Sequence, residues 1–105
     1  EGSLFKQDEL KTLVKENKLQ ILEKEFQTPV SFERFEFAID NPNHLRGNGK
    51  PFQIEILSEE GEWKKIYEGE IFGLICGKQI DPVLAKGVRL VIQADKVRYF
   101  NVYHE

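Results

Sequence analysis

Hydrophobic and polar residues alternate most clearly between residues 51 and 73. Phe52, Ile54 and Ile56 alternate with polar residues, which is the period of a strand with one buried face. A polar turn that contains a glycine follows, and a second run opens at Trp63 and ends at another glycine. Two such runs joined by a short turn predict a β-hairpin.

The same alternation recurs in residues 30–39, where Phe35, Phe37 and Ile39 occupy the apolar positions. Phe32 begins on the opposite parity, which predicts a bulge just after it. We expect further strands from residue 18 to the break at Thr28–Pro29, and in residues 71–80, 88–92 and 97–103.

Residues 8–17 differ from the rest, because Leu10, Leu13 and Val14 lie at helical spacing and predict a short helix. The strands recur at a regular spacing without βαβ alternation. The sequence therefore predicts an all-β fold, an antiparallel β-sandwich with a short N-terminal helix.

Length and charge limit what the chain can be. Its 105 residues correspond to a single domain, residues 1–105, with enough apolar residues for one core. The net charge of −3 offers no basic surface, and no apolar run reaches the length that spans a bilayer. We therefore expect neither nucleic acid nor membrane as a partner. Because the chain begins at Glu1, we expect a part of a larger protein, and the missing leader says nothing about its compartment.

Reactive chemistry is sparse in the sequence. Cys76, the only cysteine, lies in an apolar segment and predicts a buried, inert thiol. His44 and His104 are far apart, and the acidic residues around Gly61 read as an exposed turn, so we expect no metal site. The chain contains no phosphate loop, nucleophile elbow or HExxH pattern, and we expect a protein that is not an enzyme.

Several segments resemble, in order, those of one family. They are residues 30–39, residues 52–63 (FQIEILSEEGEW), residues 66–73 (IYEGEIFG) and residues 80–92 (IDPVLAKGVRLVI). Their order and spacing resemble the galactose-binding-like domain, known as the discoidin or coagulation-factor (F5/8) type C family. The chain is most similar to the carbohydrate-binding C-terminal modules of bacterial α-L-fucosidases and hexosaminidases.

This resemblance implies a jelly-roll sandwich that serves as a non-catalytic, carbohydrate-binding accessory module of a glycoside hydrolase. Its partners would be a glycan, bound weakly through loops at one end, and the catalytic domain of the same polypeptide. The implied location is extracellular or periplasmic. Family members usually begin with extra residues that supply part of a calcium site. This chain has a shorter N-terminus, so we expect no cofactor; a structural calcium is possible but not supported.

Sugar recognition needs an aromatic face for the C–H side of the ring and planar polar groups for its hydroxyls. His44, Arg46 and Asn48 lie close together on a polar loop, and Arg46 and Asn48 match sugar-contacting positions of the resembling family. Phe72, beside a glycine, could serve as the stacking platform. The alternative interpretations are a solvated turn for the loop and a core position for Phe72.

The sequence also allows other interpretations. In the resembling family, Trp63 would pack in the core. The sandwich could also brace a catalytic neighbour or bind a protein without any sugar site. An apolar patch on a sheet face would favour docking, whereas aromatic residues at the loop end would favour a ligand.

Overall fold

The computed structural model describes residues 4–15, 19–39, 49–94 and 96–104. Nearly all of them form strands, which are β1 (Lys11–Lys15), β2 (Leu19–Ile39), β3 (Lys50–Leu57), β4 (Trp63–Ile71), β5 (Ile75–Gln93) and β6 (Val97–Tyr103). A single 3₁₀ turn, η1 (Gln7–Glu9), precedes them. None of these described residues forms a helix long and apolar enough to cross a membrane.

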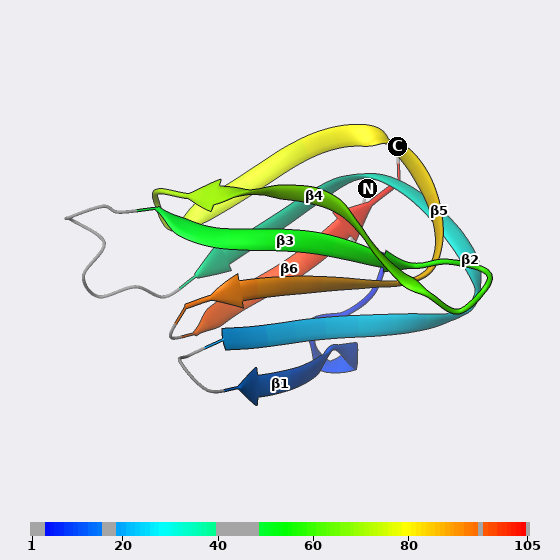
Figure 1. Cartoon of the computed structure of the whole chain (residues 1–105), viewed down its shortest axis with the longest axis horizontal. Coiled ribbons are helices and arrows are strands. Elements are labelled where there is room, and N and C mark those ends of the chain that lie inside the picture. Colours follow the sequence, from blue (N-terminus) through cyan, green and yellow to red (C-terminus); the bar gives the residue numbers. More distant parts are fainter. Residues whose placement is uncertain (1–3, 16–18, 40–48, 95, 105) are drawn as a thin grey trace.

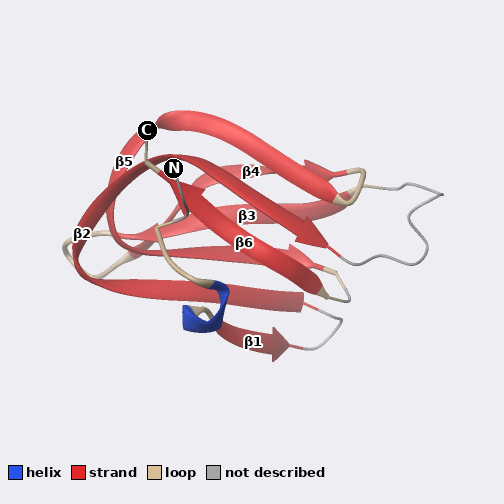
Figure 2. Ribbon diagram, turned by 180° about the vertical axis from the view of Figure 1, so that it is seen from behind, coloured by secondary structure: helices blue, strands red, loops and turns tan. Residues whose placement is uncertain are grey.

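All the strands belong to one antiparallel sheet, which β2 and β5 fold into two layers (Figure 1). The first half of β2 (residues 19–25) pairs with the end of β5 (residues 87–93), in a layer ordered β1-β2-β5-β3-β4. The second half of β2 pairs with the start of β5 and with β6, which together form the other layer. Figure 2 shows this β6 layer from its own side. The predicted antiparallel sandwich is confirmed.

Two register shifts between β2 and β5 allow these strands to cross from one layer to the other. One shift lies between Glu25 and Val30, so the break expected at Thr28–Pro29 bends the strand without ending it. The other lies between Phe32 and Arg34, which confirms the predicted bulge. Because two long strands serve both layers, the described chain has six strands where about seven were expected.

Phenylalanine and branched aliphatic side chains fill the space between the layers. Phe32, Phe35, Phe37 and Phe100 are fully buried, and the ring centroids of Phe37 and Phe52 lie 4.8 Å apart. Each such ring contributes about 1.5–3 kcal/mol by leaving water. The apolar residues of the alternating segments point into this core, as the pattern predicted.

The N-terminal helix predicted over residues 8–17 is wrong. Only the short turn η1 forms, and residues 11–15 instead pair with β2, so that Leu13 lies opposite Ile21. A helix this short is marginal in water, and β-branched Thr12 and Val14 disfavour it further, so strand pairing prevails.

The segment around η1 covers the outer edge of β6. The Leu4 N–H donates to the Val102 carbonyl at 2.9 Å. The Gln7 side chain accepts from the Phe100 N–H at 2.9 Å and donates to the Phe100 carbonyl at 3.1 Å. These bonds occupy backbone groups that an edge strand would otherwise expose.

Trp63 is not in the core, contrary to the expectation from the family. It lies half-buried on the outer face of the five-stranded layer, with the Arg89 guanidinium 4.2 Å from its ring centroid. Arg89 also bonds Glu55 and lies 3.6 Å from Glu23, so it pairs with acids on its own face. Gly87 lies beneath this cluster, since a Cβ there would be 3.3 Å from the indole. The cluster therefore stabilises an outer sheet face.

Candidate functional site

One end of the sandwich carries the most exposed large apolar side chains. β4 ends there at Ile71, opposite Lys50 at the start of β3, and a short turn leads into β5 (Figure 1). The Ile39 N–H, at the end of β2, donates to the Leu74 carbonyl of that turn at 2.9 Å. The chain segments on both sides of residues 40–48 therefore meet the β4–β5 turn, and we call this end the rim.

Phe72 lies on the rim and is 65% exposed, so it is not a core residue. Its ring rests against the backbone of Gly49. A Cβ at position 49 would lie 2.8 Å from Phe72 Cε1 and 2.7 Å from Glu70 Oε1. The absence of a side chain at Gly49 thus permits the ring to approach the chain closely, while much of its surface stays open to solvent.

Ile75, three residues after Phe72, is a second apolar residue near the β4–β5 turn and is 64% exposed. It lies on the outer face of the three-stranded layer, opposite Ala38, whose other neighbour is Tyr99. The Tyr99 hydroxyl donates to Glu36 Oε2 at 2.5 Å, and this bond, with burial and the charge of Glu36, raises the pKa of Tyr99 to about 12. Tyr99 is therefore neutral and fixed at physiological pH.

The other predicted site residues, His44, Arg46 and Asn48, lie outside the described residues. Of the predicted set, the structure thus places only Phe72. The sequence interpretation missed Ile75. Strand alternation could have found it, because its neighbour Cys76 points inward and Ile75 must then point outward.

Cys76 and the acidic turn lie where the sequence predicted them, one buried and the other exposed. Cys76 is buried, and burial raises the pKa of its thiol. The acids Glu59, Glu60 and Glu62 are exposed in the β3–β4 turn, and the described residues hold no group of side chains suited to a metal ion.

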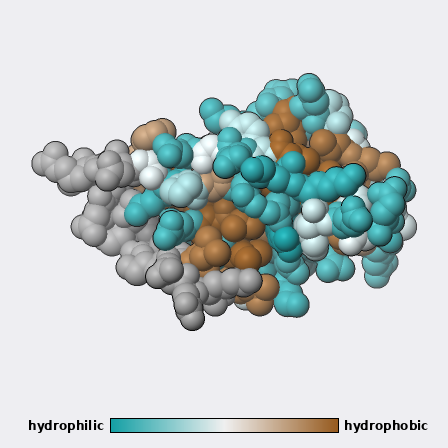
Figure 3. All heavy atoms as spheres, viewed as in Figure 1, coloured by the Kyte–Doolittle hydropathy of each residue, from teal (hydrophilic) through white to brown (hydrophobic). Residues whose placement is uncertain are grey.

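An apolar patch also lies on the outer face of the five-stranded layer, visible as a brown area in Figure 3. Register places Leu13, Ile21, Val91 and Leu19 on this face. Leu13 is 39% exposed. A shallow groove of about 150 Å³ between Leu19, Pro51 and Val91 continues the patch.

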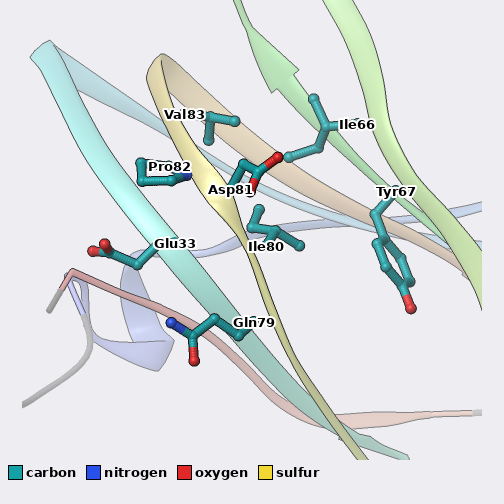
Figure 4. Close-up of a pocket in the computed structure, with 8 residues that line it drawn as sticks. All are labelled: Glu33, Ile66, Tyr67, Gln79, Ile80, Asp81, Pro82 and Val83. Atoms are coloured by element: carbon teal, nitrogen blue, oxygen red, sulfur yellow. The ribbon is translucent and has the colours of Figure 1, made fainter.

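A larger groove, of about 660 Å³, opens between β4 and the bent part of β5 (Figure 4). It lies on the long side of the sandwich and not at the rim. Its lining residues are Glu33, Ile66, Tyr67, Gln79, Ile80, Asp81, Pro82 and Val83.

No protein-family model and no curated protein matches the chain. Solved structures do match. A rhamnosidase from Novosphingobium sp. PP1Y superimposes on 89% of the chain with a TM-score of 0.71 and 22% identity. The family 32 carbohydrate-binding module of EndoD from Streptococcus pneumoniae covers 90% of it, with a TM-score of 0.69 and 15% identity. A putative α-L-fucosidase from Bacteroides thetaiotaomicron covers 90%, with a TM-score of 0.66 and 19% identity.

The chain spans only 9% of the rhamnosidase and 22% of the fucosidase, but 75% of the carbohydrate-binding module. The matching part is thus a small portion of each hydrolase chain. The antiparallel β-sandwich that the sequence predicted is confirmed, and its fold is similar to that of the EndoD carbohydrate-binding module.

Proposed function

We propose that this chain is a non-catalytic, carbohydrate-binding accessory module of a glycoside hydrolase, and that it binds glycan weakly at the rim. The observation that carries the proposal is Phe72, an aromatic ring that is 65% exposed and rests on Gly49. Exposing a large apolar ring on a fixed support is how proteins present a stacking face for the C–H side of a sugar.

The polar partners of the ring would come from His44, Arg46 and Asn48, on the segment that ends at Gly49. Their amide, guanidinium and imidazole groups are the donors and acceptors that neighbouring sugar hydroxyls need. A shallow site of this kind buries little area, so we expect a dissociation constant of roughly 0.1–10 mM. Attachment to a catalytic domain would make such weak binding useful by raising the local substrate concentration.

An NMR titration of the ¹⁵N-labelled chain tests the proposal. The ligands are galactose, fucose, rhamnose and N-acetylglucosamine, each raised to about 10 mM or more. We expect amide shifts in residues 40–50 and 72–75, and a weaker response in a Phe72→Ala variant. If the rim amides stay unchanged with every sugar, the proposal is wrong.

The apolar patch on the five-stranded layer supports a second candidate function, in which the module also docks on a neighbouring domain of its own polypeptide. Leu13, Ile21 and Val91 form a patch on a broad sheet face, the kind of surface that interdomain contacts cover. Hydrogen exchange compared between the isolated module and the whole polypeptide tests this idea. Protection of β1 and β2 only in the whole polypeptide would support docking, and equal exchange would contradict it.

A further inference from the structure

The groove between β4 and β5 lies about 17 Å along β4 from Phe72 and therefore forms a separate location. Ile66 and Tyr67 of β4 form one wall, and residues 79–83 of β5 form the other (Figure 4). Its volume of about 660 Å³ is within the range of ligand sites in proteins. We infer that this groove is a second glycan site, which takes interior units of a neutral oligosaccharide. The inference rests on the proposed function for its ligand class.

The strands that flank the groove are protected against pairing with a peptide. Among the described residues, β4 and the first half of β5 each pair on one side only. Lys64 and Lys78 lie opposite buried core residues and so occupy inward-facing positions. Ile66 is the extra residue of a register shift in β4, and Pro82 lies in the bulge of β5. Inward charges, bulges and proline all disfavour the addition of a strand. A ligand in this groove would therefore be bound by side chains and not by backbone hydrogen bonds.

The groove offers side-chain groups suited to sugars. The Tyr67 ring is held in place by Phe35 and Phe52, with centroids 5.2 and 5.9 Å away. In the part of the chain that the structure describes, the side chains of Tyr67, Gln79 and Asp81 make no hydrogen bond or ion pair. Gln79 points away from Tyr67 in Figure 4, so the Tyr67 hydroxyl and the Asp81 carboxylate are the groups that remain able to bond with the hydroxyls of a ligand.

The charges of the groove favour a neutral glycan. Its charged lining residues are Glu33, which lies 3.1 Å from His104 Nδ1, and Asp81, which is exposed. Lys64 and Lys78 are exposed and do not line the groove, so its two carboxylates would repel the acid group of a uronic or sialic acid. Because the groove is lined from two sides by β4 and β5 and is open to solvent, a chain can pass along it.

A residue-resolved titration separates the two sites. Neutral oligosaccharides of two to six units, and their monosaccharides, are added to the ¹⁵N-labelled chain. Amides of residues 66–67 and 79–83 should shift more with oligosaccharides than with monosaccharides. Asp81→Asn keeps the shape of the side chain but loses a charge-assisted hydrogen bond. The oligosaccharide affinity fitted from these shifts should therefore fall about tenfold. The matched control, Glu60→Gln in the exposed β3–β4 turn, should have no effect.

The outcomes distinguish this inference from the proposed function. Shifts at the rim alone would overturn the inferred groove site and leave the proposed rim site standing. Shifts in the groove alone would overturn the rim site and support the groove site. Groove shifts that persist in Phe72→Ala support a separate site. An anionic oligogalacturonate that binds the groove as tightly as a neutral chain would overturn the inference. So would an extended peptide of alternating apolar and basic residues, if it alone shifts these amides.

Discussion

Adding one methyl group at Gly49 should displace the Phe72 ring without unfolding the domain. A Cβ at position 49 would lie 2.7–2.9 Å from Glu70 Oε1 and from Phe72 Cε1 and Cζ, and real Cβ atoms do not approach so closely. These atoms are the far ends of exposed side chains, which can rotate away. Gly49→Ala therefore moves the proposed stacking surface and little else.

The expected magnitudes follow from these contacts. Because the displaced groups are exposed, the free energy of unfolding should change by no more than about 0.5 kcal/mol. An aromatic contact contributes about 0.5–1.5 kcal/mol, so its loss should weaken sugar binding by roughly 2- to 10-fold. Gly73→Ala is the matched control, since a Cβ there meets no atom within 4 Å, and we expect both quantities to stay unchanged.

Urea denaturation measures the stability of both variants, and NMR titration with the best-binding sugar measures their affinity. If Gly49→Ala binds as tightly as the unmodified chain, Phe72 is not the stacking surface. A loss of several kcal/mol in its stability would instead show that the Phe72 and Glu70 side chains cannot rotate away from position 49.

Three further predictions concern the core and its surroundings. Phe37→Ala should lower the free energy of unfolding by about 3–5 kcal/mol in urea denaturation, because the ring is fully buried; a loss under 1 kcal/mol would contradict this. The hydrogen bond to Glu36 raises the pKa of Tyr99 to about 12, so the stability that this bond contributes is complete below pH 10 and is lost as the pH rises towards 12. In urea denaturation, Tyr99→Phe should lose less stability over that pH range than the unmodified chain. Equal losses would contradict the hydrogen bond. Burial raises the pKa of Cys76, so a thiol reagent at pH 8 should label the native chain far more slowly than the chain in urea; equal rates would place this thiol at the surface.

Much of the fold could be predicted from local patterns, because each strand has one buried face. Phe35, Phe37 and Ile39 alternate in the sequence and all point into the core. The first strand could not be predicted in this way. Residues 8–17 have a helical pattern, and only pairing with β2 makes part of them a strand. Such pairing depends on residues distant in sequence, and no local pattern reveals it.

The sites were less predictable than the fold. Phe72 could be picked out because it is an aromatic residue beside a glycine, but its support at Gly49 is distant in sequence. The groove arises from a register shift that sets residues 80–82 opposite Glu33, and from a bulge at Ile66 in β4. Sequence alternation indicates that a bulge exists, but it does not show which two strands flank the resulting space.

Contact between Phe72 and a sugar can be observed directly. The chain is labelled at its phenylalanine rings, and intermolecular nuclear Overhauser effects to the C–H protons of a bound glycan are recorded. Binding at the rim predicts effects from the ring of Phe72, which is 65% exposed, and none from the fully buried rings. A bound sugar that shows no effect to Phe72 would contradict the proposed site.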